Sequence, residues 1–148
     1  MLTQEMVRLI SSFSAGAVAT VNADGSPSVS PKATFVILDA QTLAFGHIRS
    51  PGTVRNLHRN PAIEICFTDI VTRRAVRVTG TAAVIPRADA APELDAAFDA
   101  AWSLYRPHMK AYVKVAITAA EMIWSPAYDL GLTEDELRKA NLEKLNAL

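Results

Sequence analysis

The sequence predicts an α+β protein in which six antiparallel strands form a barrel and helices lie between the strands or at the ends. Three observations support this fold class. Six segments have the length and apolar pattern of strands, at residues 17–21, 27–38, 43–48, 62–68, 75–85 and 110–125. Most connections between successive strands are short, which favours antiparallel pairing. Three other segments space their apolar side chains as helices do, at residues 3–13, 93–106 and 133–148, and an N-cap residue followed by proline predicts a fourth helix at residues 51–60.

Length and charge restrict the classes of function. The 148 residues suit a single domain, residues 1–148, and contain no internal repeat or low-complexity linker. Lys and Arg together number 15, as do Asp and Glu, so there is no basic surplus for nucleic acid or an anionic membrane. No apolar run is long enough to span a membrane, and the first residues lack the pattern of a signal peptide. We therefore expect a soluble, cytoplasmic protein without nucleic-acid or membrane partners.

The first elements follow from capping and turn signals. Thr3 can cap a helix whose apolar stripe is Met6, Leu9, Ile10 and Phe13. The pair Asp24-Gly25 predicts a tight turn, so that residues 17–21 and 27–38 form a hairpin. The second of these strands alternates strictly, and its polar side chains share one side: Ser28, Ser30, Lys32 and Thr34.

The segment around Ser50 predicts an anion site. An apolar strand at residues 43–48 leads into Ser50, which occupies the position of a helix N-cap, with Pro51 as the first helical residue. The first turn of a helix has backbone N–H groups without intrahelical partners, and the helix dipole makes that end partly positive. Arg49 adds a full charge and Thr53 adds a hydroxyl, while Gly52 allows close approach to the backbone. A phosphate group suits this segment.

Two more polar groups are expected at the same corner. The short connection at residues 38–42 returns the strand 43–48 antiparallel to the strand 27–38. Ser30 and Lys32 can then lie near Arg49 and Ser50. Two cations, three hydroxyls and a helix N-terminus would then converge on one point, and the repulsion between the positive groups is unfavourable unless an anion is bound. The alternative is an ordinary solvent-facing row of polar side chains.

The remaining elements are predicted by the same signals. Gly80 within the strand 75–85 predicts a bulge or a close backbone approach. Trp102 is interpreted as a core anchor of the helix 93–106, which Pro107 ends. Thr133 and Glu136 form a capping-box pattern at the start of the last helix. Because the strands at residues 43–48 and 62–67 are apolar on both faces, a second chain is a candidate to cover part of the barrel.

Several chemistries find no support in the sequence. The three histidines, His47, His58 and His108, have no second ligand at metal spacing, so no metal site is expected. Cys66 is the only cysteine and reads as a packed strand residue. Nucleophile-elbow, Rossmann and phosphate-loop glycine motifs are absent. If the protein is an enzyme, we expect a bound cofactor to supply its reactivity.

Three motifs together resemble a known family. They are DGSPSVSPK at residues 24–32, the pattern FGxxxSxxTxxNLxxNP at residues 45–61, and VxGTA at residues 78–82. The chain from residue 18 to about residue 85 is similar to the FMN-binding split-barrel proteins related to pyridoxamine 5′-phosphate oxidase. The resemblance implies a six-stranded split barrel with peripheral helices. It also implies a homodimer with FMN at the subunit interface.

The resemblance also implies roles for particular residues. Lys32 and Arg49 would neutralise the FMN phosphate, and Ser50 and Thr53 would donate hydrogen bonds to it. Weaker candidates at this end are Ser30 and Asn56. The backbone of Gly46, His47 and Ile48 would run beside the isoalloxazine ring, and the partner subunit would contribute Arg77 and Trp124.

The family resemblance specifies the cofactor better than the substrate. The C-terminal residues 129–148 lack the Arg-containing segment that the resemblance would require of a true pyridoxamine 5′-phosphate oxidase. The first hypothesis is an FMN-dependent oxidoreductase that takes electrons from a nicotinamide or small organic donor and reduces a small planar acceptor. The second is a non-catalytic module that stores or senses flavin or haem, since some related barrels bind haem or a deazaflavin. A structural dimer without cofactor is the third.

Overall fold

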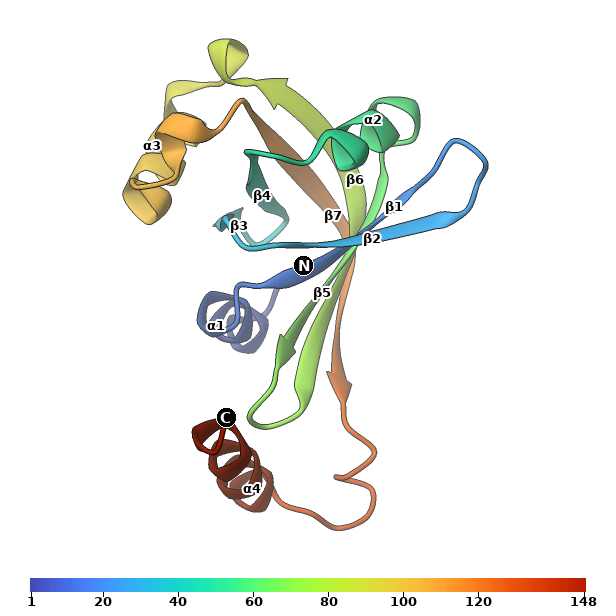
Figure 1. The fold of residues 1–148 in the computed structure, drawn as a ribbon, viewed down its shortest axis with the longest axis vertical. Helices are drawn as coiled ribbons and strands as arrows, with labels where there is room; N and C mark the ends of the chain where they lie inside the picture. The colour runs from blue at the N-terminus through green and yellow to red at the C-terminus, as the bar shows by residue number, and fades with distance from the viewer.

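Seven antiparallel strands form one curled sheet in the computed structural model, which describes residues 1–148 (Figure 1). The strand order is β2-β1-β5-β6-β7-β4-β3. The elements in chain order are α1 (Gln4–Ser12), β1 (Gly16–Val21), β2 (Pro27–Lys32), β3 (Phe35–Asp39), β4 (Thr42–His47), α2 (Pro51–Arg59), β5 (Ala62–Asp69), β6 (Arg74–Pro86), α3 (Pro92–Trp102), β7 (Ala111–Trp124) and α4 (Glu134–Asn146). Two 3-10 turns, Arg87–Asp89 and Arg106–His108, flank α3. The α+β class is confirmed.

The predicted strand 27–38 is in fact two strands, which corrects the strand count from six to seven. β2 and β3 are joined only by Ala33 and Thr34, yet they lie at opposite ends of the strand order. The sheet therefore curls until its two edges meet at this corner. The backbone N–H of Gly46 donates to the Thr34 carbonyl at 3.3 Å and lies 3.2 Å from the Thr34 hydroxyl. No ladder pairs β2 with β3, so the sheet is open rather than a closed barrel.

Local signals place most element ends correctly. The turn at Asp24-Gly25 forms, with Gly25 at a φ of 85° and the Asp24 carboxylate accepting the Ser26 N–H at 3.0 Å. The capping box at Thr133 and Glu136 is present in both directions. α3 is shorter than predicted and ends at Trp102, because the chain then turns into the 3-10 segment that contains Pro107.

The largest core cluster fills the inside of the curled sheet. Phe45 and Phe67 are fully buried, and Leu9 and Ile10 of α1 close one end. A second cluster lies between β4 and α3 and contains Val36, Ala44, Leu94, Phe98, Met109 and Tyr112. The second apolar face of β4 is thus covered by α3 of the same chain. This strand therefore no longer supports the expectation of a covering second chain, which itself stays a prediction.

The predicted irregularity at Gly80 is a bulge between β6 and β7, because the pairing register shifts between Thr79 and Gly80. A Cβ atom at Gly80 would lie 2.5 Å from the carbonyl oxygen of Ala116. This neighbour is backbone and cannot move aside as a flexible side chain can.

We expect Gly80→Ala to destabilise the fold by about 1–3 kcal/mol, because the methyl group overpacks the bulge. The measurement is urea unfolding. Thr81→Ala, at an exposed neighbouring position, should stay within about 0.5 kcal/mol of the wild type. Equal stability of the two variants would contradict this account of the bulge.

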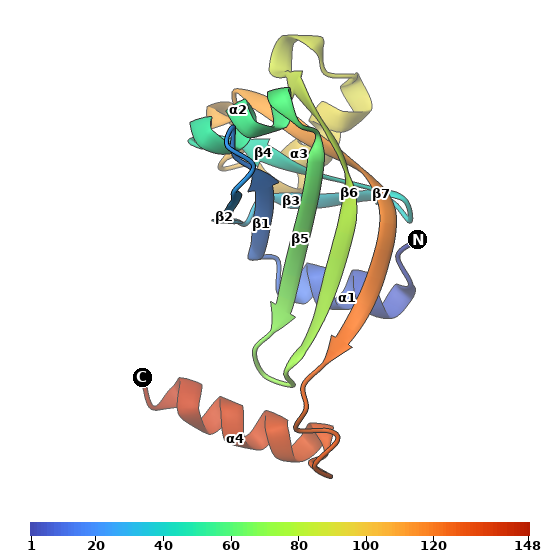
Figure 2. The same ribbon diagram turned by 90° about the vertical axis from the view of Figure 1, so that its right-hand side faces the viewer.

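A buried carboxylate organises the turn between β5 and β6. Asp69, only 5% exposed, accepts the backbone N–H groups of Val71 and Thr72 at 2.9 and 3.0 Å and also the Thr72 hydroxyl. Arg74 lies 3.8 Å from Asp69 and bonds Glu5 of α1 at 3.0 Å. Asn141 of α4 donates to the Val71 carbonyl at 2.8 Å. The turn therefore fastens both terminal helices, and Figure 2 shows α4 at this end of the long strands, away from α2 and α3.

Candidate functional site

Side chains from β2 and α2 meet at the corner where β4 runs into α2. The ammonium of Lys32 donates to the Ser30 hydroxyl at 2.6 Å, and this hydroxyl lies 3.3 Å from the Thr53 hydroxyl. Ser30 and Lys32 alternate along β2 with the outward-facing Pro31, while Val29 on the outer side is 66% exposed. The polar row of β2 therefore faces α2 and is half-buried, whereas the apolar side chain faces solvent. The structure brings Ser30, Lys32 and Thr53 together.

The start of α2 offers unpaired hydrogen-bond donors. Ser50 is the N-cap, but its side chain makes no capping hydrogen bond, and Pro51 has no N–H. The backbone N–H groups of Gly52 and Thr53 have no protein partner. The first turn of α2 contains no acidic residue. This end of the helix is therefore electropositive and its donors are available.

The two cations of the corner lack counter-ions within the chain. Lys32 makes no ion pair, and its only hydrogen-bond partner is Ser30. Burial lowers the pKa of Lys32 from its ordinary value. Arg49 is exposed and has neither an ion pair nor a hydrogen bond. A bound anion would compensate these charges, so the residues present fit a phosphate group.

The strand that leads to this corner is largely committed to packing. A Cβ at Gly46 would overlap the Met109 sulfur, so the tight contact with Met109 accounts for this glycine. The His47 carbonyl accepts the Lys110 N–H at 2.8 Å. Ile48 packs on the cluster between β4 and α3. The Gly46 N–H, which bonds Thr34, is not available to a ligand.

The imidazole of His47 is an exception. Its Nδ1 atom is buried without a hydrogen-bond partner. An unpaired buried polar atom is unfavourable. Burial lowers the pKa of His47, and the charges of Lys110 and Lys32 lower it further.

We expect His47 to titrate below the ordinary histidine value of about 6.5 in the ligand-free protein. Lys32→Met should raise the pKa of His47, because it removes one of the repelling charges. The pH dependence of the His47 ring signals in NMR measures both effects. Lys114→Met, at an exposed lysine of β7, is the control and should leave the pKa of His47 unchanged. The same pKa in the Lys32 variant as in the wild type would contradict the proximity of these two side chains.

Asn56 is committed to a structural role. Its amide nitrogen donates to Thr20 and Asn22 at 3.0 Å each, and its oxygen accepts from Arg59 at 2.7 Å. These bonds fasten α2 to the β1–β2 hairpin and leave the Asn56 amide no free N–H. A concavity of about 470 Å³ lies beside it, between this hairpin and α2.

Arg77 and Trp124 lie far from the corner within one chain. Arg77 pairs with Glu64 at 3.5 Å and also with Glu121 on the outer face of the sheet. β7 pairs with His47 at its first residue and ends at Trp124, so the tryptophan lies at the opposite end of this long strand. The Trp124 ring is 50% exposed and packs against Tyr128 and under Arg74. The structure does not bring these two residues to the corner of their own chain.

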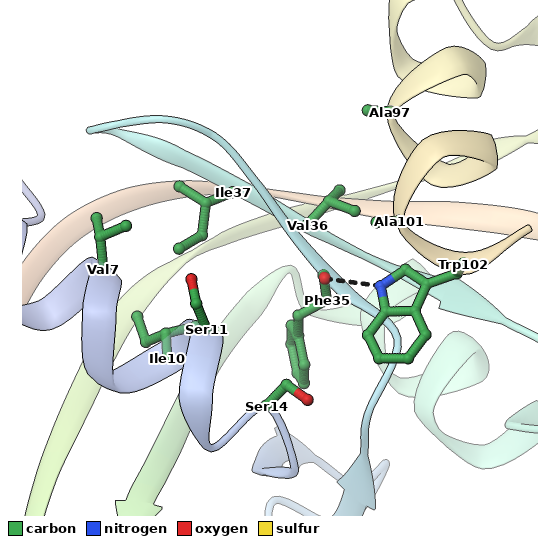
Figure 3. A pocket seen from close by; sticks show the side chains of 10 residues that line it. All are labelled: Val7, Ile10, Ser11, Ser14, Phe35, Val36, Ile37, Ala97, Ala101 and Trp102. Carbon is green, nitrogen blue, oxygen red and sulfur yellow. Dashed lines mark hydrogen bonds between the residues drawn. The ribbon is translucent and has the colours of Figure 1, made fainter.

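Sequence reasoning missed a second concavity, which lies between α1, β3 and α3 and has a volume of about 520 Å³ (Figure 3). Trp102 forms part of its wall, and the indole N–H donates to the Phe35 carbonyl at 2.9 Å. Trp102 is therefore half-buried at a concave surface rather than a core anchor. The only local signal was the pair of small residues, Ala97 and Ala101, on the same side of α3 as Trp102.

No helix of the structure has the length and apolar composition needed to cross a bilayer. No group of three or more His, Cys, Asp or Glu side chains is arranged to hold a metal ion.

Comparisons with known proteins agree with the fold. The family profile described as pyridoxamine 5′-phosphate oxidase matches residues 2–125. No curated protein matches the chain. The structure of HupZ from Group A Streptococcus is 28% identical, with a TM-score of 0.71 over 84% of this chain and 96% of that one. A candidate pyridoxamine 5′-phosphate oxidase from Lactobacillus delbrueckii is also 28% identical, with a TM-score of 0.69 over 81% and 93% of the two chains.

A third structure, of an F420 reductase, shares the fold at 24% identity, with a TM-score of 0.57 over 72% of this chain and 88% of that one. Proteins of the matched family generally bind flavin-type cofactors and are commonly dimeric. The match to the family profile runs from α1 to the end of β7 and so includes all seven strands. The chain therefore belongs to the pyridoxamine 5′-phosphate oxidase-like family of split-barrel proteins.

Proposed function

We propose that this protein is a homodimeric FMN-binding oxidoreductase that reduces a small planar acceptor. The observation that carries the proposal is the corner at the start of α2. There Lys32 is half-buried without a counter-ion, Arg49 directly precedes the N-cap residue and makes no ion pair, and the first N–H groups of α2 have no protein partner. Such a concentration of positive charge and donors fits the phosphate of a nucleotide-type cofactor.

Each residue of the corner has a distinct part in this proposal. Lys32 and Arg49 neutralise the phosphate, while the hydroxyls of Ser50 and Thr53 donate hydrogen bonds to it. Ser30 holds Lys32 in place through the 2.6 Å hydrogen bond. The unpaired Nδ1 of His47 can hydrogen-bond a polar edge of the ligand. When bound, FMN supplies the hydride and electron chemistry that the side chains of this protein do not.

The second subunit is proposed to complete the site. Trp124 is half exposed and distant from the corner of its own chain, and Arg77 lies on the outer face of the sheet. Side chains so placed can reach a cofactor only in a neighbouring subunit. Members of the family are commonly dimeric, which supports this arrangement.

The test begins with the absorption spectrum of the purified protein and mass analysis of any molecule released on denaturation. We expect bound FMN, or FMN uptake by the colourless protein, and bleaching of the flavin when NADH, NADPH or a small organic donor is added without oxygen. Protein that neither contains nor takes up FMN would contradict the proposal.

A non-catalytic flavin or haem store is the second candidate, because no carboxylate contacts Lys32, Arg49 or His47 to serve as a general acid or base. Flavin that no donor in a broad panel reduces would favour storage over catalysis. A Soret band would favour haem.

A further inference from the structure

The groove between α1 and α3 has the dimensions and lining of a ligand site. Its volume of about 520 Å³ lies within the range of small-molecule pockets, roughly 300–1,000 Å³. Eight of its ten lining residues are hydrophobic, and no charged side chain lines it. Figure 3 shows Val7 and Ile10 of α1 on one side, Ala101 and Trp102 of α3 on the other, and Phe35 and Ile37 of β3 between them.

Both walls of the groove are held by separate interactions with the sheet. α1 buries Met6, Leu9 and Ile10 in the main core. α3 is fixed by Phe98, which stacks on Tyr112 with ring centroids 4.3 Å apart, and by Asp95, which bonds Tyr112 and Arg106. The gap between the helices is therefore preformed, and a ligand would not have to order it.

Trp102 is a rigid part of the wall. Its indole N–H donates to the Phe35 carbonyl at 2.9 Å, which fixes the orientation of the ring (Figure 3). A fixed aromatic face can contact a planar ligand with little loss of side-chain freedom.

The groove also contains a few unpaired polar groups. The backbone of Thr34 accepts a hydrogen bond from Gly46 of β4. Along an antiparallel pair, every second residue hydrogen-bonds the neighbouring strand, so Val36 also bonds β4. The backbone N–H and C=O of Ile37 therefore point away from β4, to the open edge of β3. The neighbouring edge carbonyl of Phe35 is occupied by Trp102. Ser11 and Ser14 lie on the α1 side, and their hydroxyls have no protein partner. An apolar groove with few polar groups fixes the orientation of a ligand as well as its position.

We propose that this groove is a second binding site, for an uncharged planar ring compound that carries one amide-like edge. The ring lies against Trp102, and the edge pairs with the backbone of Ile37 and the hydroxyl of Ser11. The absence of charged lining residues disfavours ionic ligands, because an ion would lose part of its hydration without gaining a charged partner. The site shares no residue with the anion corner, so the inference does not rest on the proposed function.

The two tryptophans allow a direct test. Trp102 lies in the groove and Trp124 is at the far end of β7, so their indole N–H signals in a ¹H–¹⁵N spectrum report on separate places. We expect 1-naphthamide to shift the Trp102 signal saturably, with a Kd of about 1 mM or tighter, and to leave the Trp124 signal unchanged. The anion 1-naphthoate should have at least tenfold weaker affinity. Trp102→Phe and Trp124→Phe assign the two signals.

Matched variants of α3 complete the test. Ala101→Phe should fill the groove and weaken 1-naphthamide at least tenfold, whereas Ala100→Phe, an exposed neighbour outside the groove, should leave the affinity unchanged. Val7→Phe should fill the groove from the α1 side. Its affinity for 1-naphthamide provides the same test if Ala101→Phe folds poorly. Shifts of both indole signals, equal affinity for the two naphthalenes, or unchanged binding in both filled variants would overturn the proposal. A lower oligomeric mass in the filled variants would also overturn it, since the groove would then be a subunit interface.

Discussion

Lys32→Met is expected to weaken FMN binding by about 10- to 100-fold, which corresponds to the 1.5–3 kcal/mol of a hydrogen bond to a charged group. The ammonium already lies at the corner through its bond to Ser30, so little order has to be gained when the phosphate arrives. Arg49→Ala should also weaken binding. Thr53→Ala should have a smaller effect, about fivefold, because a neutral hydrogen bond contributes about half as much as a charge-assisted one.

The measurement is a fluorescence titration of the FMN-free protein with FMN. Lys114→Met is the control, because it removes an exposed cation of β7 that lies outside the proposed contacts. Wild-type affinity in both charge variants, Lys32→Met and Arg49→Ala, would show that the phosphate lies elsewhere. Equal weakening by the control variant would indicate a general charge effect rather than a specific site.

Asp69→Ala should destabilise the fold by about 3–5 kcal/mol, as expected when one partner of a buried charged network is removed. The backbone N–H groups of Val71 and Thr72 would lose their acceptor in a buried turn. The variant should also loosen α1 and α4, because Arg74 and Asn141 bind them to this turn. Chemical unfolding gives the free energy, and hydrogen exchange shows which helices loosen. Stability within 1 kcal/mol of the wild type would contradict the role of Asp69.

We also expect Asp69 to make part of the free energy of unfolding sensitive to acid. Burial raises the pKa of Asp69, but the hydrogen bonds from Thr72 and Val71 and the charge of Arg74 outweigh burial, so the net shift is downward. The folded protein then binds fewer protons than the unfolded chain near pH 4. This stabilisation is present above the ordinary aspartate pKa and is lost as the pH falls through the lowered pKa of folded Asp69.

Asp69→Asn should therefore make unfolding free energy less dependent on pH between about pH 5 and pH 2. Asp39→Asn is the matched control, because Asp39 also accepts a turn N–H, that of Gln41, but is exposed. The control should retain the wild-type pH dependence. An unchanged slope in the Asp69 variant would assign the acid sensitivity to other carboxylates.

Signals within a few residues predicted much of the fold. Ser50 with Pro51, and Thr133 with Glu136, mark helix starts whose geometry depends only on neighbouring residues. Gly80 indicated the bulge because a glycine inside a strand is typical of such irregularities, although the residue that makes it necessary, Ala116, is distant in sequence. The division of the strand 27–38 could not be predicted, because Ala33 and Thr34 continue its alternation. Only the curl of the whole sheet sends β2 and β3 to opposite edges.

The candidate site was predictable in part. The meeting of Ser30, Lys32 and Thr53 followed from a short return connection and a helix start. The commitment of Asn56 to Thr20, Asn22 and Arg59 depends on where the hairpin packs, which no local pattern encodes. Asp69 appeared only as part of a connection, although the spacing of Asp69 and Thr72 is that of a carboxylate that caps its own turn.

The segment that carries α3 leaves and re-enters the sheet at one point. Pro86 and Ala111 are paired neighbours on β6 and β7, and the N–H of Arg87 donates to the Lys110 carbonyl at 3.2 Å. Residues 87–110, which include α3, therefore form a long insertion between the two strands of a β-hairpin. Its length and sequence can change during evolution without altering the register of any strand. Related proteins can therefore change the wall beside β3 through the α3 part of this insertion, provided that Met109 and Lys110, which contact Gly46 and His47 next to the anion corner, are kept.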